Sequence, residues 1–125
     1  MSVLIVEDDR FQASYLETLF RLRGYAICGV VKSGKEAIAA AQAKNPDILI
    51  VGVGLSGGFD GIDAAKPIIA TRSCGLIFIT GYDNEVLIAR MNALKPSAII
   101  SKPFFERQLL AAVEKIVARR PVGVT

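Results

Sequence analysis

Apolar residues follow two patterns along this chain: short continuous runs, and longer stretches in which they recur every three or four residues. The continuous runs lack the alternation of a half-exposed strand, so they predict strands that are covered on both faces. The stretches of helical period predict helices between the runs. The predicted strands are 2–6, 25–31, 47–52, 75–80 and 98–101, and the predicted helices are 11–23, 34–44, 62–71, 84–94 and 105–119.

Particular residues mark the expected ends of the helices. Gly24 fits a C-terminal glycine of the first helix, and Ser33 is a candidate N-cap of the second. Asp83 or Asn84 can cap the fourth helix, and Pro67 is expected to shorten or kink the third. The residues of the first helix that are expected to face the core form a stripe: Phe11, Tyr15, Leu19 and Leu22, with Leu16 and Phe20 alongside.

Five alternating strand–helix units predict an α/β fold with a doubly wound parallel sheet and helices on both faces. The flavodoxin-like (βα)5 arrangement, with strand order 2-1-3-4-5, is the natural choice because five units are too few to close a barrel. We expect a single domain over residues 1–120 and a frayed C-terminal tail over residues 121–125.

Composition and charge exclude several classes of function. The net charge is +3, but the basic residues are scattered along the chain, which does not favour nucleic-acid binding. No apolar run approaches the length of a membrane span and no secretory signal opens the chain, so we expect a cytoplasmic protein that does not bind membranes. The chain has no histidine, which rules out histidine-dependent catalysis and imidazole metal sites. Cys28 and Cys74 are expected to be unpaired, small core residues.

The predicted topology brings polar residues together at one edge of the sheet. In the order 2-1-3-4-5 the carboxyl ends of the first, third and fifth strands lie near one another, and ligands of such sheets bind there. These ends carry the acids Glu7 and Asp8, the glycines of the turn after residue 51, and Lys102, with Thr80 close by. The third strand ends at Gly52, which offers no side chain for chemistry.

The chain resembles the receiver domain of two-component response regulators from residue 3 to about residue 119. The resemblance rests on the order and spacing of five segments: Val-Leu-Ile-Val-Glu-Asp-Asp at 3–9, Pro-Asp-Ile-Leu-Ile at 46–50, Asp-Gly-Ile at 60–62, Phe-Ile-Thr-Gly at 78–81 and Ser-Lys-Pro-Phe at 101–104. Each segment is weak evidence alone. Their combination is specific.

The resemblance implies a role for each residue at the edge of the sheet. In the family, the acids after the first strand bind Mg²⁺, and here they correspond to Glu7 and Asp8. Gly54 lies where a backbone carbonyl serves as a further metal ligand. An aspartate at the end of the third strand normally supplies another carboxylate and is absent here, so we expect Mg²⁺ binding to be weak, if it occurs at all.

The same resemblance identifies position 52 as the main departure from the family. There the family has the aspartate that takes a phosphoryl group from a histidine kinase, and this chain has Gly52. Thr80 matches the hydroxyl residue and Lys102 the lysine that contact the phosphoryl oxygens. Ile99 lies where the family usually has a switching tyrosine or phenylalanine.

Simpler interpretations stay open for several of these residues. Asp8 or Asp9 can serve as the N-cap of the first helix instead of a metal ligand. Thr80 fits an ordinary residue at the end of a strand. Lys102 has no partner at position 52 and can pair with Glu7 or Asp8. Pro103 can follow a cis peptide bond, as in the family, or start a helix.

Residues 52–57 also match the G-x-G-x-x-G pattern of dinucleotide-binding sites. The pattern lies in the third strand–helix unit instead of the first, four residues separate it from the next helix, and no acid ends the following strand. We therefore interpret the match as accidental.

The function predicted is that of an atypical, stand-alone receiver domain, not an enzyme, that acts by binding proteins in a phosphorelay. One alternative is a conventional receiver in which Gly52 is a variant or engineered replacement, and another is a small α/β nucleotide-binding protein or enzyme. The expected partner is a histidine kinase, a phosphotransfer protein or an output protein, with a homodimer also possible. The fourth helix, 84–94, is apolar nearly all round, which predicts a contact surface there. The resemblance adds residues 98–101 and 105–119 to the expected surface, since receivers often bind through their fourth and fifth helices and the strand between.

Overall fold

The computed structural model describes residues 1–55, 59–81 and 84–119, and it contains five strands and five helices that alternate along the chain. The strands are β1 (Ser2–Val6), β2 (Ala26–Val31), β3 (Ile48–Gly52), β4 (Gly75–Thr80) and β5 (Ala98–Ser101). The helices are α1 (Arg10–Leu22), α2 (Gly34–Lys44), α3 (Gly61–Ala70), α4 (Glu85–Ala93) and α5 (Glu106–Arg119). The predicted elements are therefore all present, with small differences at their ends. The predicted tail at 121–125 lies outside the described residues.

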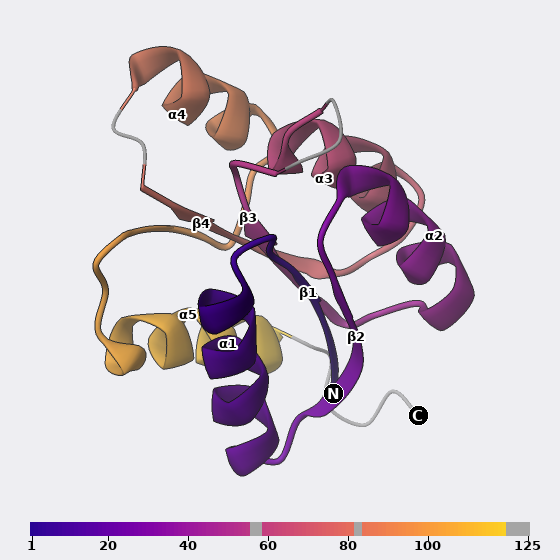
Figure 1. Ribbon diagram of the computed structural model, residues 1–125, viewed down its shortest axis with the longest axis vertical. Coiled ribbons are helices and arrows are strands. Elements are labelled where there is room, and N and C mark those ends of the chain that lie inside the picture. The colour runs from indigo at the N-terminus through magenta and orange to yellow at the C-terminus, as the bar shows by residue number, and fades with distance from the viewer. Residues whose placement is uncertain (56–58, 82–83, 120–125) are drawn as a thin grey trace.

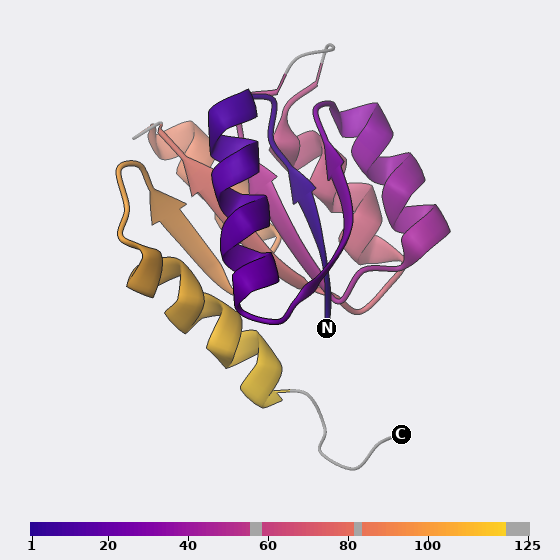
Figure 2. The same ribbon diagram turned by 60° about the horizontal axis from the view of Figure 1, so that its bottom comes forward.

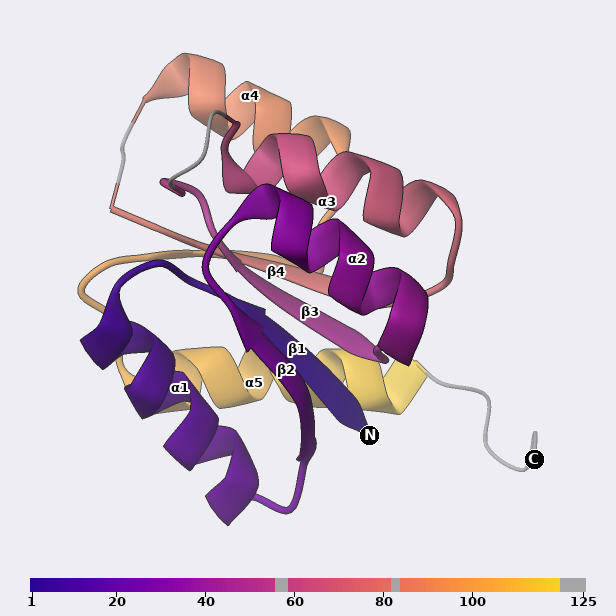
Figure 3. The same ribbon diagram turned by 45° about the vertical axis from the view of Figure 1, so that its right-hand side comes forward.

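The strands form one parallel sheet in the order β2-β1-β3-β4-β5, which confirms the predicted fold class (Figure 1). Helices α1 and α5 cover one face of the sheet, and α2, α3 and α4 cover the other (Figure 3). The strands run in the same direction, so their carboxyl ends lie along one edge of the sheet (Figure 2). That edge is where the predicted site residues should meet.

The apolar runs of the sequence are explained by a core on each face of the sheet. Successive side chains of a strand point to opposite faces. The core on one face therefore contains the side chains of Val3 and Ile5 of β1 and of Ile48 and Ile50 of β3. The core on the other face contains those of Leu4, Val6, Leu49 and Val51. Every residue of β3 is buried, as expected for the central strand of a covered parallel sheet. Deep burial of β3 fixes the position of Gly52 at its end.

Most predicted helix ends are confirmed by hydrogen bonds or dihedral angles. Gly24 follows α1 with a φ of 87°, and Ser33 Oγ accepts a 3.2 Å hydrogen bond from the Glu36 N–H at the start of α2. Asn84 is the N-cap of α4. Asp9, not Asp8, caps α1 by accepting a 2.9 Å hydrogen bond from the Gln12 N–H. This assignment leaves Asp8 at the edge of the sheet for another role.

Three expectations about side chains are corrected by the structure. Phe11, Tyr15 and Leu22 of the predicted α1 stripe are 85%, 42% and 80% exposed. The sheet and α5 contact the neighbouring face of α1, which carries Ala13, Leu16, Leu19 and Phe20. Helix α3 is not shortened at Pro67, which is exposed, and continues to Ala70. Cys28 and Cys74 are free, as predicted, but only half buried, since they lie near the rim of the core.

No helix in the described parts of the chain combines the length and the hydropathy that crossing a bilayer requires. The Lys102–Pro103 peptide bond is cis, and Pro103 lies before α5, so it is not the first residue of that helix.

Candidate functional site

The predicted site residues come together in a hollow of about 430 Å³ at the carboxyl edge of the sheet. Each belongs to a strand end or to the residues that follow it, so the parallel sheet alone is enough to collect them. A backbone hydrogen bond of 2.8 Å from the Lys102 N–H to the Thr80 carbonyl ties the end of β5 to that of β4. The lining comprises Glu7, Asp8, Gly52, Val53, Gly54, Ile79, Thr80, Gly81 and Lys102.

Glu7 is the most deeply buried charged residue of the site, with its side chain 3% exposed. Its Oε2 atom accepts a 3.1 Å hydrogen bond from the Asp9 N–H. Its Oε1 atom accepts no hydrogen bond from any residue that the structure describes, and lies 3.6 Å from Lys102 Nζ. Burial raises the pKa of Glu7 above its ordinary value, and the Asp9 N–H and Lys102 offset only part of this effect. The site thus contains an ion pair between buried Glu7 and partly exposed Lys102.

Gly52 is buried and is the last residue of the central strand β3, as the sequence predicted. A β-carbon at this position would lie 2.8 Å from Glu7 Oε1, closer than such atoms approach in real proteins. Position 52 therefore offers neither a nucleophile nor a metal ligand from a side chain. The carboxylate of Glu7 lies in the space that a side chain at position 52 would enter.

The donors present do not make up a complete Mg²⁺ site. Magnesium requires near-octahedral coordination by oxygen, with carboxylates as its usual protein ligands. Asp8 is exposed and Glu7 is already engaged with Lys102. Among residues 1–55, 59–81 and 84–119 there is no group of three or more histidine, cysteine, aspartate and glutamate side chains that could hold a metal. Weak Mg²⁺ binding by Glu7, Asp8 and the Gly54 carbonyl stays a prediction.

We expect titration with Mg²⁺ to give a dissociation constant of about 1 mM or weaker, because one carboxylate is missing and a second is paired with a lysine. Isothermal calorimetry of the purified domain measures this constant, with the Asp8→Asn variant as a control for non-specific binding. A micromolar constant that Asp8→Asn abolishes would contradict this reading of the site.

Sequence reasoning did not find the ion-pair cluster that holds α4 against α3. Arg90 donates hydrogen bonds of 2.8 and 3.2 Å to the two carboxylate oxygens of Asp60, and one of 2.9 Å to Asp63. Burial alone would raise the pKa of Asp60, but the hydrogen bonds from Arg90 and from the backbone outweigh it, and the pKa lies below its ordinary value. Asp60 and Asp63 also form the capping box of α3, and no sequence signal linked them to Arg90.

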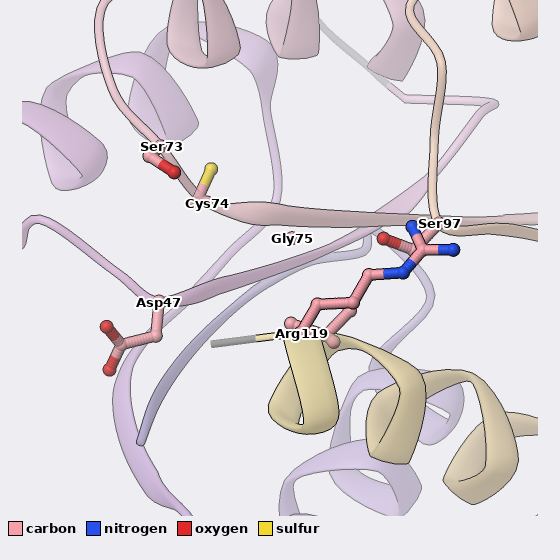
Figure 4. Close-up of a pocket in the computed structure, with 7 residues that line it drawn as sticks. Asp47, Ser73, Cys74, Gly75, Ser97 and Arg119 are labelled. Atoms are coloured by element: carbon pink, nitrogen blue, oxygen red, sulfur yellow. The ribbon is translucent and has the colours of Figure 1, made fainter. Parts of the chain in front are cut away.

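A second hollow, of about 380 Å³, lies at the opposite edge of the sheet (Figure 4). Arg119 reaches toward Ser97 in this view, whereas the carboxylate of Asp47 points away from both. Asp47 Oδ2 accepts a 2.8 Å hydrogen bond from the Ser2 N–H. Burial raises the pKa of the Cys74 thiol, which disfavours a reactive thiolate. The polar groups of this hollow do not converge, so we assign it no function.

The glycine pattern at 52–57 gains no support as a nucleotide site. Gly52 ends β3 and Gly54 is exposed, while α3 begins only at Gly61. Dinucleotide sites place the pyrophosphate at the start of a helix that follows the glycines directly. Residues 56–58 lie outside the described part of the chain.

Comparisons with known proteins agree with this fold. Residues 3–114 match the model of the response regulator receiver domain. Among similar proteins, the transcriptional regulatory protein PdtaR of Mycobacterium tuberculosis is 33% identical over 94% of this chain and 57% of its own length. The phyllosphere-induced regulator PhyR of Methylorubrum extorquens is 30% identical over 90% of this chain and 42% of its own length. The chain thus spans about half the length of these curated relatives.

A similar solved structure is the signal receiver domain of a modulated diguanylate cyclase from Desulfovibrio desulfuricans. Its TM-score is 0.87 and its sequence identity 32%, and the match covers 94% of this chain and 93% of that one. The match to the family model over residues 3–114, together with the shared fold, shows that the chain belongs to the family of response regulator receiver domains of two-component signalling.

Proposed function

We propose that this domain is an atypical receiver that acts by binding proteins in a phosphorelay and does not accept a phosphoryl group at position 52. The observation that carries this proposal is that β3 ends in Gly52, so that no carboxylate from position 52 lies in the hollow it shares with Lys102. Phosphoryl transfer to a receiver requires an oxygen nucleophile in line with the phosphorus atom. Lys102 and Thr80 can stabilise charge, but they cannot replace that nucleophile.

On this proposal the domain signals through its abundance and through whether a partner protein is bound to it, and it is not itself an enzyme. A conventional receiver in which Gly52 replaces the usual aspartate differs at this one residue, and the mass measurement in the Discussion separates the two. The stand-alone arrangement and the cytoplasmic location expected from the sequence stay predictions.

We place the proposed partner surface on α4, β5 and α5, which follow one another along the chain. Of these, β5 is the outermost strand on its side of the sheet. Of the residues of α4, all of which the structure describes, Met91 alone is fully buried. Val86 is 68% exposed, and Ala89 and Ala93 are exposed as well. On α5, Val117 is 41% exposed. Exposed apolar residues on α4 favour contact with a protein, either a phosphorelay component or a second copy of this chain.

The variant Val86→Lys, Ala93→Glu should weaken self-association or partner binding by about tenfold or more, because it places two charges in an apolar contact. Analytical ultracentrifugation measures self-association, and pull-down with a candidate kinase measures partner binding. Ala39→Glu, at an exposed position of α2, is the matched control and should change neither.

Val86 and Ala93 suit this test better than Ile88, which packs against the core and whose substitution would also affect folding. Binding and self-association that both persist in the double variant would exclude α4 from the interface.

A further inference from the structure

The carboxylate of Glu7 lies directly over Gly52. A β-carbon added to Gly52 would be 2.8 Å from Glu7 Oε1, 3.2 Å from its carboxyl carbon and 3.4 Å from Oε2. All three atoms of the carboxyl group are therefore within contact distance of that one point. An aspartate at position 52 could enter this space only if Glu7 moved away.

Glu7 also has the surroundings of a residue that needs a positive partner. Its side chain is 3% exposed, and burying an ionised carboxylate is unfavourable unless it is paired or hydrogen-bonded. Its Oε2 atom is satisfied by the Asp9 N–H, whereas Oε1 accepts no hydrogen bond from the described residues. Lys102 Nζ lies 3.6 Å from Oε1.

Lys102 is positioned for this role by the backbone. Its N–H donates a 2.8 Å hydrogen bond to the Thr80 carbonyl, which fixes the residue at the end of β5. Its side chain, 37% exposed, reaches across the hollow from β5 to the residue that follows β1.

We propose that Glu7 supplies, from the neighbouring strand, the carboxylate that Gly52 lacks, and is the resident counter-ion of Lys102. Glu7 is thus a positioning residue that holds Lys102 and fills the site, in place of the metal ligand implied by the family. The carboxylate of Glu7 thus balances the positive charge of Lys102 within the hollow. This inference deepens the proposed function, since it takes position 52 as unphosphorylated.

The reactivity of Lys102 toward an amine-acylating reagent tests the proposal. Removal of the counter-ion in Glu7→Ala or Glu7→Gln should raise the rate of Lys102 acylation by about threefold. A change of this size is what the loss of a partly exposed ion pair should produce. Peptide mass spectrometry measures the rate at each lysine, with exposed Lys115 of α5 as the internal reference. Glu7→Gln keeps the shape of the side chain, so it serves if Glu7→Ala fails to fold.

A carboxylate exchange tests whether Glu7 takes the place of a residue at position 52. The double variant Glu7→Ala, Gly52→Asp should restore the low acylation rate of Lys102, because it returns a carboxylate to the same space from β3. Glu7→Ala, Gly52→Ala adds a side chain without charge and should leave the rate high. A merely structural role of Glu7 would make these two double variants alike.

An unchanged acylation rate of Lys102 in Glu7→Gln would overturn the proposal. It would also be overturned if the double variant Glu7→Ala, Gly52→Asp acylated Lys102 as fast as Glu7→Ala, Gly52→Ala does. The experiment uses no phosphoryl donor. If the unmodified domain were to gain a phosphoryl group while Lys102 behaves as expected, the proposed function would fail and this inference would stand.

Discussion

Incubation of the domain with acetyl phosphate or a cognate kinase should leave its intact mass unchanged, whereas the Gly52→Asp variant should gain one phosphoryl group. The acyl phosphate of the family forms when a carboxylate oxygen attacks phosphorus while nearby cations neutralise the equatorial oxygens. The hollow contains Lys102 and Thr80, but its position 52 has no side chain. Electrostatic stabilisation without a nucleophile gives no covalent product.

The Gly52→Asp variant requires a rearrangement that the structure defines. The new β-carbon would meet Glu7 Oε1 at 2.8 Å, so the carboxylate of Glu7 must swing away. It is the far end of a flexible side chain, and this movement is feasible. Gly52→Asp, Lys102→Ala is the matched control and should be phosphorylated far more slowly, because it retains the nucleophile and loses the cation.

Other acids near the hollow are poorly placed to replace the missing aspartate. Asp60 is held by Arg90 and by the Asp63 N–H at the start of α3. Glu7 is paired with Lys102. A labile phosphoryl adduct on the unmodified sequence, mapped by peptide mass spectrometry to any carboxylate around the hollow, would refute the proposed function.

Gly61→Ala should lower the free energy of unfolding by about 1–3 kcal/mol, the usual cost of forcing an extra group into a packed core. A β-carbon at Gly61 would lie 2.2 Å from the Gly52 carbonyl oxygen and 2.5 Å from Val51 Cγ1. The first of these is backbone of the central strand and cannot move aside as a side-chain tip can. Urea unfolding followed by circular dichroism measures the change.

Gly81→Ala is the matched control for this substitution. Gly81 also borders the hollow, but a β-carbon there would meet nothing within 4 Å. Its free energy of unfolding should stay within about 0.5 kcal/mol of the unmodified protein. Helix propensity alone favours alanine over glycine, so a stabilised Gly61→Ala variant would show that α3 is not pressed against the end of β3.

The sequence by itself determined the elements, the order of the strands and the family. Apolar runs such as 48–51 and 76–79 indicate burial on both faces, because four consecutive apolar side chains in a strand place two on each face of the sheet. The rules of parallel sheets then place Glu7, Gly52, Thr80 and Lys102 at one edge. For this reason the residues of the site could be named before their geometry was known.

Only the tertiary structure decided which side chains meet within that frame. Phe11 fits the helical period of α1 and is nevertheless exposed, because the face a helix buries depends on the elements that pack against it. Glu7 was one of two acids that could pair with Lys102, and the choice followed from its burial beside a glycine. The contact of Arg90 with Asp60 joins residues 30 positions apart. Sequence patterns report local periodicity, whereas these contacts depend on how separate elements approach in space.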